Sequence, residues 1–381
     1  MKSRRISATI LLMLMLVVPI GIFANARING RQFPKYNPFY YMKEYMSEIE
    51  SFLQENFPFG DELKNSAVKL QLWLGEQEHE GVFIGEDILI EDIGQPDEEI
   101  MGKNLQELQA FVDMNSSVPV SVLYLPSKYA IKQQELPDNA ELFGFNQKSF
   151  IEQSYNALQG KATTVDAYSV LLANSDKYLY YRTDPNLTGL GAYYVYNSLI
   201  DRMGMEPLSA DAFQQQHICH DFYGTTYETS SYKEISPDII TLYHPTNQQS
   251  ASVTHFNNYT YTYNTLYPEH LLDLDAGLSV ILGGDTGDLT IHSALKRHRT
   301  LLVFGDSSIM PVLPLLSAHY YQIRFIDFEH WNDTALEELD VDNYDHVLLA
   351  YSVDSMIHDP YPAQIRRVRQ QQEERWESYA E

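Results

Sequence analysis

Apolar residues recur along this chain with two periods that alternate over most of its length. Spacings of three and four residues predict amphipathic helices, and short apolar runs bounded by turn residues predict buried strands. The helical pattern covers residues 41–52, 61–74, 104–114, 128–134, 150–158 and 192–200. The strand pattern covers residues 118–125, 163–166, 278–282, 301–304, 321–326 and 347–351. The alternation favours parallel βαβ units, with crossover helices covering the faces of one sheet.

The middle of the chain has a different pattern. Residues 217–274 are rich in Tyr, Thr, Ser and Asn, and Tyr259, Tyr261 and Tyr263 alternate with threonines. Alternation with a period of two predicts β hairpins inserted beside the main sheet. Residues 81–85 and 88–90 predict one more short hairpin.

The first 26 residues have the pattern of an export signal. Lys2, Arg4 and Arg5 form a basic start, residues 6–24 carry no charge, and Ala24-Asn25-Ala26 offers a small-x-small cleavage site. A signal peptide and a retained membrane anchor both fit, because the uncharged stretch approaches the length that spans a bilayer. We therefore expect an exported protein, either extracellular or anchored on the outer face of the cytoplasmic membrane.

Four regions follow from these patterns. They are the signal peptide or anchor at 1–26, a linker and helical region at 27–80, an α/β domain at 81–365, and a charged tail at 366–381. The tail has a dense mixture of charges and few apolar anchors, so we expect a solvated helix or a frayed end there.

The acidic composition excludes several classes of partner. The 381-residue chain has a formal net charge of -26, whereas a nucleic-acid-binding surface needs a basic footprint. The same charge disfavours docking to anionic lipids, so we expect membrane contact only through the N-terminal segment. Cys219 is the single cysteine, so no intramolecular disulfide can form. No motif predicts a cofactor.

A serine follows one of the predicted strands. Gly305-Asp306-Ser307-Ser308 comes directly after the apolar run at 301–304. Ligands of open α/β sheets bind in a crevice outside the carboxyl ends of the strands. We therefore expect this loop to face such a crevice, with the preceding strand as a rigid support. A hydroxyl there attacks a carbonyl carbon when a base removes its proton and backbone N–H groups stabilise the oxyanion. The tetrapeptide also fits a simple helix cap, with Asp306 or Ser307 at the N-cap.

A second polar turn, Thr183-Asp184-Pro185-Asn186, precedes the helical pattern at 192–200. Asp-Pro initiates helices well, so a purely structural turn is one interpretation.

Two histidine motifs are further candidates. Asp327-Phe328-Glu329-His330 has a spacing that can orient an imidazole beside a serine, and a surface loop beginning a helix near 331–333 is the alternative. His217-Ile218-Cys219-His220 resembles a metal cluster but lacks a second ligand pair, so we predict no metal site.

Several short motifs occur in a fixed order along the chain. They are Glu50-Ser51-Phe52, Asn56-Phe57-Pro58-Phe59, Gly81-Val82-Phe83-Ile84-Gly85, Tyr124-Leu125-Pro126-Ser127, Leu136-Pro137, Tyr180-Tyr181-Arg182-Thr183-Asp184, Thr188, Gly191-Ala192-Tyr193-Tyr194, Phe222-Tyr223-Gly224-Thr225, Gly283-Gly284-Asp285, Leu301-Leu302-Val303-Phe304-Gly305-Asp306-Ser307 and Tyr344-Asp345-His346-Val347-Leu348. This ordered set resembles the DHHW family, exported proteins of Gram-positive bacteria that are similar to the AlgJ/AlgX acetyltransferase-like proteins of the SGNH-hydrolase group.

The resemblance implies an SGNH-like three-layer α/β/α sandwich with a mainly parallel sheet and a Ser-His-Asp site. The nucleophile of the family follows the apolar strand, here Ser307. Its Asp and His come from the Asp-His-His-Trp turn, here Asp184-Pro185-Asn186-Leu187. Asp184 matches, but Asn186 occupies the position of the histidine. The resemblance also implies that the neighbouring pocket is formed by Thr183, Tyr181, Arg182, Gly283, Gly284 and Asp306.

The asparagine changes the expected chemistry. An amide nitrogen has no basic lone pair near neutral pH, so Asn186 cannot take the Ser307 proton. Loss of one triad member costs about four to six orders of magnitude in rate. Three hypotheses follow: the chain keeps the pocket without the chemistry, it recruits another base, or the pocket no longer matters in a binding or assembly protein. The candidate bases are His330, His220 and His255.

By resemblance, we expect an exported protein related to O-acetyltransferases and esterases of cell-envelope or secreted polysaccharide, with impaired catalysis. The implied ligand is a polysaccharide or an acyl ester, and a membrane acyl-transfer partner is compatible with the family. The alternative is a non-catalytic polysaccharide-binding or scaffold protein of the cell envelope. Tyr259, Tyr261 and Tyr263 favour this alternative, because aromatic faces stack on sugar rings, although such a row also fits a packed sheet face.

Overall fold

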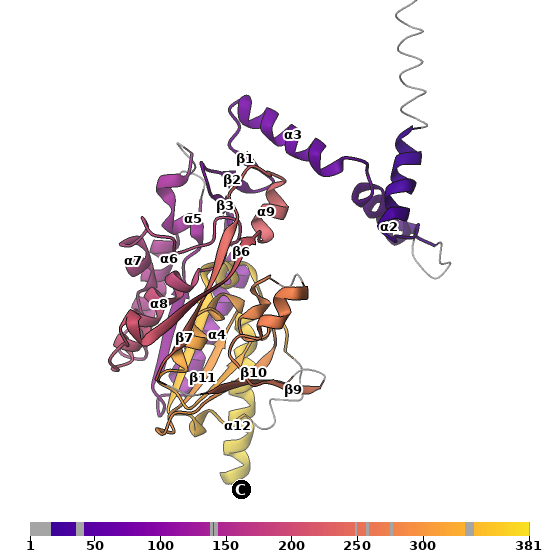
Figure 1. Ribbon diagram of the computed structural model, residues 1–381. Coiled ribbons are helices and arrows are strands. Elements are labelled where there is room, and N and C mark those ends of the chain that lie inside the picture. Colours follow the sequence, from indigo (N-terminus) through magenta and orange to yellow (C-terminus); the bar gives the residue numbers. More distant parts are fainter. Residues whose placement is uncertain are drawn as a thin grey trace, which may run out of the picture. The chain divides into compact units, whose positions relative to one another are not determined.

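The computed structural model describes residues 17–35, 42–137, 140, 144–247, 250–256, 259–274, 277–331 and 339–380. The chain forms two compact units, one of Met1–Glu76 with Ser231–Lys233 and one of Gln77–Ser230 with Glu234–Glu381. Every candidate site residue lies in the larger unit, several of whose elements are labelled in Figure 1.

The smaller unit is helical. Residues 17–28 form one helix, and α2 (Met42–Glu55) and α3 (Gly60–Trp73) follow, which confirms the two helices predicted at 41–52 and 61–74. Most of the predicted export segment, residues 1–16, lies outside the described residues. Among those that are described, no helix is both long and apolar enough to cross a bilayer.

A mixed eight-stranded sheet forms the centre of the larger unit (Figure 1). In spatial order its strands are β5 (Thr163–Val165), β4 (Val120–Leu125), β13 (His346–Ser352), β11 (Thr300–Gly305), β12 (Gln322–Ile326), β10 (Asp288–Ser293), β8 (Ala251–Phe256) and β9 (Thr260–Tyr263). The strands from β5 to β12 are parallel, and β10, β8 and β9 are antiparallel to their neighbours. The predicted α/β class with a mainly parallel sheet is confirmed.

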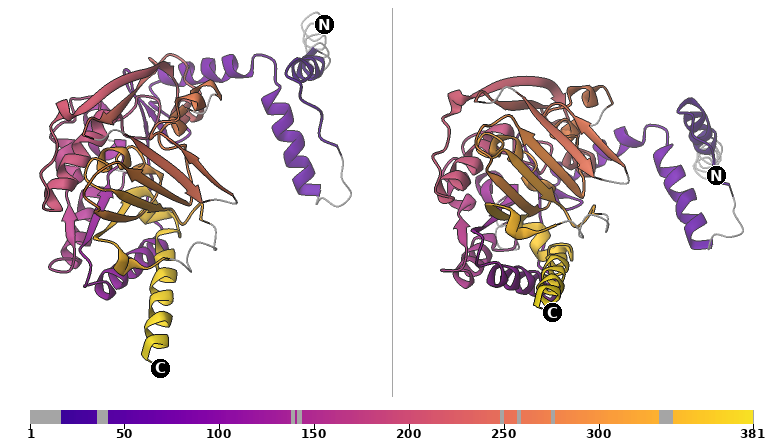
Figure 2. Two further views of the ribbon diagram at one scale, coloured as in Figure 1. Left: turned by 60° about the horizontal axis from the view of Figure 1, so that its bottom comes forward. Right: turned by 90° about the horizontal axis from the view of Figure 1, so that it is seen from below.

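Helices flank this sheet in two groups, which makes the central strands buried on both faces. All six residues of β4 are buried for this reason. One group packs α4 against α11 and α12, and the other packs α8 against α7 and α10; Figure 2 shows α12, in yellow, beside α4. The helices of the larger unit are α4 (Glu98–Met114), α5 (Lys128–Ile131), η1 (Gln133–Glu135), α6 (Gln147–Ala157), α7 (Ala167–Leu172), α8 (Gly189–Arg202), η3 (Ala210–Ala212), α9 (Thr225–Ser230), η4 (Glu269–Leu274), η5 (Gly277–Val280), η6 (Ser307–Ile309), α10 (Leu313–Leu316), η8 (Val341–Asn343), α11 (Val353–His358), η9 (Pro362–Ile365) and α12 (Arg366–Ala380).

The predicted hairpins are present. A small three-stranded sheet contains β1 (Glu78–His79), β2 (Val82–Ile84) and β3 (Leu89–Glu91). In the described part of the chain, the long strands β6 (Phe213–Phe222) and β7 (Asp238–Pro245) form a separate two-stranded sheet, whereas β8 and β9 extend the main sheet at its edge.

Two features of the larger unit differ from the sequence prediction. Residues 278–282 were predicted as a strand, which is wrong: they form the end of η5 and a turn that continues into Gly283 and Gly284, both at positive φ. The strand of this region is β10, which the pattern missed because polar residues interrupt it. The tail forms α12, and its first half is not solvated, because Val368 and Gln372 are buried and Arg369 contacts Glu107 of α4 at 3.0 Å.

Candidate functional site at the end of the parallel strands

The two polar turns that the sequence singles out meet in the structure. Ser307 lies two residues after the end of β11, and Asn186 lies in the turn that Tyr180 and Leu187 close by an antiparallel bridge. Ser307 and Asn186 line the same two cavities. Ser307 is exposed, and in the described part of the chain neither its hydroxyl nor its amide N–H has a hydrogen-bond partner. Both groups are therefore available to a ligand.

Asp306 fixes the turn that carries Ser307. Its Oδ1 accepts a hydrogen bond from the Ser308 amide at 3.0 Å and caps η6, as the helix-cap interpretation expects. Its Oδ2 accepts hydrogen bonds from the amide and the hydroxyl of Ser352, at 2.7 and 2.8 Å. Because Ser352 is the last residue of β13, Asp306 ties the Ser307 turn to the end of the neighbouring strand.

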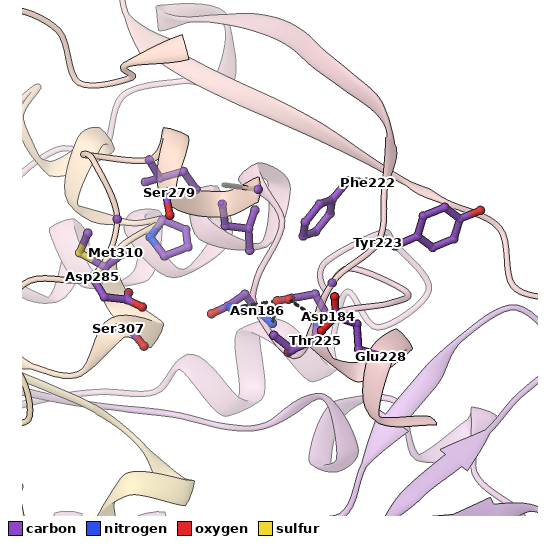
Figure 3. A pocket seen from close by; sticks show the side chains of 16 residues that line it. Asp184, Asn186, Phe222, Tyr223, Thr225, Glu228, Ser279, Asp285, Ser307 and Met310 are labelled. Carbon is purple, nitrogen blue, oxygen red and sulfur yellow. Dashed lines mark hydrogen bonds between the residues drawn. The ribbon is translucent and has the colours of Figure 1, made fainter. Parts of the chain in front are cut away.

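The Asn186 side chain is held by Asp184. Asp184 Oδ1 accepts hydrogen bonds from the backbone amide of Asn186 at 3.0 Å and from its Nδ2 at 2.8 Å. A carboxylate only accepts, so Nδ2 must face Asp184 and Oδ1 must point the other way. Figure 3 shows that Ser307 and Asp285 lie on that other side. Asn186 thus offers an N–H to Asp184 and an acceptor oxygen toward Ser307, as a histidine would do with its two ring nitrogens.

A buried carboxylate supports this turn from behind. Asp238, the first residue of β7, is fully buried and accepts hydrogen bonds from the amides of Arg182 and Thr183 at 2.7 and 2.8 Å. The hydroxyls of Thr183 and Tyr178 also donate to it. Tyr181, Arg182 and Thr183 line neither cavity that contains Ser307. They therefore support the turn and do not face a ligand there.

A glycine brings a further segment against the turn. The amide of Gly224 donates to Thr183 Oγ1 at 3.0 Å, and the amide of Thr225 donates to Asp184 Oδ2 at 3.3 Å. A Cβ atom at Gly224 would lie 2.3 Å from the Asp184 carboxylate, so a larger residue does not fit without displacing it. Asp184 is 3% exposed and is reached by donors on both oxygens.

The first cavity, which we call the tyrosine cavity, has a volume of about 310 Å³. Figure 3 shows Asp285 beside Ser307 at one side, and Glu228, Phe222 and Tyr223 at the other, with Asn186 and Asp184 between. Gly284 also lines it, whereas Gly283 does not. This volume is at the lower end of the range of small-molecule sites. The remaining lining residues are Gly224, Thr225, Gly277, Leu278, Ser279, Ile281, Met310 and Pro311.

The second cavity, the lysine cavity, has a volume of about 300 Å³ and contains Lys128. The ammonium of this buried lysine donates to the carbonyl oxygens of Leu89 at 2.6 Å and Arg182 at 3.4 Å. Burial lowers the pKa of Lys128 to about 8, although the carboxylates of Asp184 and Glu91 oppose this shift. Among the residues that line the two cavities, Lys128 is the one basic side chain.

No histidine is brought to Ser307. All 12 histidines lie in the described part of the chain, and none lines either cavity. His255 is buried beneath Tyr261, and its Nε2 contacts the Leu282 carbonyl at 2.7 Å. His330 Nδ1 pairs with the buried Asp327 at 3.1 Å, and His220 lies exposed on β6. The spatial arrangement gives none of the three proposed replacement bases a contact with the serine.

One group of side chains could supply metal ligands. Atoms of Asp327, Glu329 and His330 lie within 4.8 Å of one another at the end of β12. Burial raises the pKa of Asp327 to about 6. His330 is already hydrogen-bonded to Asp327, and Glu329 is exposed.

Comparison with known proteins places this chain in a family. The model of the DHHW protein family matches residues 110–324, more than half of the chain, and this range includes Asp184, Asn186 and Ser307. The chain belongs to the DHHW family. No curated protein matches it.

Solved structures share the fold of this DHHW protein at low sequence identity. A DHHW family protein from Eubacterium siraeum is 21% identical with a TM-score of 0.64, covering 76% of this chain and 96% of that one. Bacillus cereus PatB1 is 14% identical with a TM-score of 0.58, covering 73% and 98% respectively. PatB1 has also been solved with a sulfonyl adduct, and that structure has a TM-score of 0.57 at 14% identity, covering 72% of this chain and 94% of that one.

Several residues of this DHHW site were not predicted from the sequence. Glu228 and Lys128 line the two cavities, and Asp238 holds the turn, although none belongs to a motif that indicates chemistry. Lys128 follows the motif Tyr124-Leu125-Pro126-Ser127. Its position shortly after a buried strand is the one signal in the sequence that could have indicated it.

Proposed function

We propose that this chain is an exported protein of the cell envelope that binds an acyl-ester or polysaccharide ligand at Ser307, with acyl transfer impaired by Asn186. The family and the shared fold support the acyl-transfer relationship, and the basic and apolar N-terminal pattern supports export. A membrane acyl-transfer partner is part of the same hypothesis, because exported acyl transfer needs a donor outside the cytoplasm.

The reaction of an active relative explains why one residue matters so much. The serine Oγ forms a bond to the carbonyl carbon of the donor ester, and the ester C–O bond then breaks. A base takes the serine proton and returns it to the leaving oxygen, and a sugar hydroxyl or water later releases the acyl group by the same steps in reverse. In this chain the Ser307 amide is free to stabilise the oxyanion, but the group in the base position is an amide.

The contact that carries the proposal is the 2.8 Å hydrogen bond from Asn186 Nδ2 to Asp184 Oδ1. It keeps the hydrogen-bond directions of the missing histidine while removing its basicity. A pocket that had lost its function altogether would not need to keep these hydrogen-bond directions at position 186. The proposal is therefore an acyl site that lacks its base and retains its other parts.

Hydrolysis of p-nitrophenyl acetate tests this proposal. We expect very slow turnover by the unmodified protein, no further loss in Ser307→Ala, and a gain of at least about 10³-fold in Asn186→His. Asn186→His combined with Ser307→Ala is the control, and it should return the rate to the starting value. Robust Ser307-dependent turnover by the unmodified protein would contradict the proposal.

A second candidate function is a non-catalytic polysaccharide-binding or scaffold protein. Tyr259, which directly precedes the edge strand β9, is 73% exposed, and its ring lies 5.7 Å from that of Tyr261. Exposed aromatic faces can stack on sugar rings. If Asn186→His remains inert and an oligosaccharide binds with an affinity that Tyr259→Ala weakens and Ser307→Ala does not, this function is favoured.

A further inference from the structure

Ser307 lies where two cavities meet. The tyrosine cavity and the lysine cavity share Asn186 and Ser307 and no other lining residue. A serine that is reached from two sides can contact one ligand on each side. The chemistry of the two linings therefore indicates which ligand belongs to which cavity.

The tyrosine cavity has the lining of a sugar site. Phe222 and Tyr223 line one side of it, and the ring of Tyr223, which is 39% exposed, extends outward from the rim, away from Asn186 and Ser307 (Figure 3). Glu228 and Asp285 are exposed carboxylates on opposite sides of the cavity (Figure 3). Within the described residues neither forms a hydrogen bond or a salt bridge. Aromatic faces pack against sugar rings, and free carboxylates accept hydrogen bonds from sugar hydroxyls.

The charge of this lining restricts the sugar. Among the described residues, those that line the tyrosine cavity include three carboxylates, Asp184, Glu228 and Asp285, and no basic side chain. Like charges at a binding surface disfavour a ligand and opposite charges favour it. A uronic acid or a phosphorylated sugar would place its anion beside Asp285 and Glu228. A neutral sugar avoids this repulsion, and an ammonium group converts it into attraction.

The lysine cavity has a different lining. Ile93, Leu125 and Leu187 give it apolar surface, and the aromatic residue of its lining, Tyr180, is buried. Its charged lining residues are Lys128 and the five carboxylates of Glu91, Asp306, Glu329, Asp354 and Asp359. An acyl group needs little more than an apolar surface beside the nucleophile. We infer that the tyrosine cavity is the glycan subsite, specific for neutral or amino sugars and not acidic ones, and that the acyl group lies in the lysine cavity. This inference rests on the proposed function, because it takes the ligand to be a glycan.

Calorimetric titration of the full protein tests the sugar chemistry directly. The probes are oligomers of glucosamine, N-acetylglucosamine and galacturonic acid at low ionic strength. We expect the glucosamine oligomer to bind most tightly, the N-acetylglucosamine oligomer less tightly and the galacturonate oligomer not measurably. Added salt should weaken binding of the glucosamine oligomer and leave binding of the N-acetylglucosamine oligomer unchanged, because salt screens only the attraction between ammonium groups and carboxylates. Equal or tighter binding of galacturonate would overturn the inference.

Matched substitutions test the side on which the sugar binds. Asp285→Asn in the tyrosine cavity should weaken the glucosamine oligomer about three-fold, a usual loss for an exposed charge pair. Asp354→Asn is the same change at an exposed position of the lysine cavity, and it should leave that affinity unchanged. Tyr223→Ala should weaken both amino-sugar oligomers, whereas Tyr223→Phe keeps the ring and should not. Equal effects of Asp285→Asn and Asp354→Asn would place the sugar elsewhere.

Failure of this inference and failure of the proposed function are distinguishable. If Asn186→His gains esterase activity while no oligomer binds, the acyl site stands and the glycan subsite does not. If the oligomers bind as expected while Asn186→His stays inert, the glycan subsite stands and the acyl chemistry does not.

Discussion

The Nδ2 atom of Asn186 lies 2.8 Å from Oδ1 of Asp184, and the partner that Asp184 orients is therefore an amide. In a Ser-His-Asp site the aspartate sets the tautomer and orientation of the imidazole, and changing it to asparagine lowers kcat by about 10⁴. In this chain, the effect of substituting Asp184 on the rate should therefore depend on which residue occupies position 186.

Asp184→Asn should have a large effect in one background and little effect in another. In Asn186→His we expect it to lower kcat for p-nitrophenyl acetate by about 10⁴, because the new imidazole loses its orienting carboxylate. In the unmodified protein it should change the residual rate little, because no imidazole is present to orient. Steady-state rates of the four proteins form a complete cycle. Equal losses in both backgrounds would show that the unmodified protein already uses a base.

Asp238→Asn should destabilise the fold through the same turn. The fully buried Asp238 accepts hydrogen bonds from two backbone amides and two hydroxyls, and an asparagine would turn an NH₂ group toward some of these donors. We expect a loss of about 3 kcal/mol in the free energy of unfolding, measured by urea denaturation. Asp87→Asn is the matched control, because Asp87 pairs with Arg182 at 3.0 Å but its side chain is 48% exposed, and its loss should stay below about 1 kcal/mol.

Much of this fold was predictable because its central strands are continuous apolar runs. β4 and β11 are buried on both faces, so nearly all of their residues are apolar. Such a continuous apolar run can be recognised in the sequence without knowing the position of the strand in the sheet. β10 was not predictable in this way. It is a strand whose Asp288 is buried and pairs with Arg324 of β12 at 2.7 Å, a contact that only the folded chain creates. Residues 278–282 show the opposite case, since Val280, Ile281 and Leu282 are buried although they lie at the end of η5 and in the turn after it.

The site was predictable only where a motif carries it. Ser307 and Asp184 lie in short segments that resemble a known family, and the structure places both at one cavity. Asp238 and Glu228 have no such signal. Asp238 lies 55 residues from Thr183 in sequence, and it becomes part of the site only because β7 begins against the turn. Supporting residues of this kind are set by tertiary contact and leave no local pattern.

Gly224→Ala should distort the site with little effect elsewhere. The new Cβ would lie 2.3 Å from the Asp184 carboxylate, so the carboxylate or its turn must move. We expect a loss of about 1–3 kcal/mol in the free energy of unfolding, and loss of any activity gained by Asn186→His. Gly102→Ala is the control: a Cβ there meets nothing within 4 Å, and in helix α4 an alanine should stabilise by up to about 1 kcal/mol. Equal effects of the two substitutions would contradict the close packing at Gly224.

Lys128 should make stability rise with pH in the alkaline range. Its pKa is about 8 in the folded protein because burial disfavours the ammonium, and it returns to about 10.4 in the unfolded chain. Between these values the unfolded chain binds more protons, so raising the pH favours the folded state, by up to about 3 kcal/mol for a complete shift. Lys128→Met removes this titration. Both proteins are denatured with urea at pH 7.5 and at pH 9.5. The free energy of unfolding of the unmodified protein, relative to that of Lys128→Met, should rise by about 2 kcal/mol between these two pH values. A difference that stays constant would mean that Lys128 stays charged.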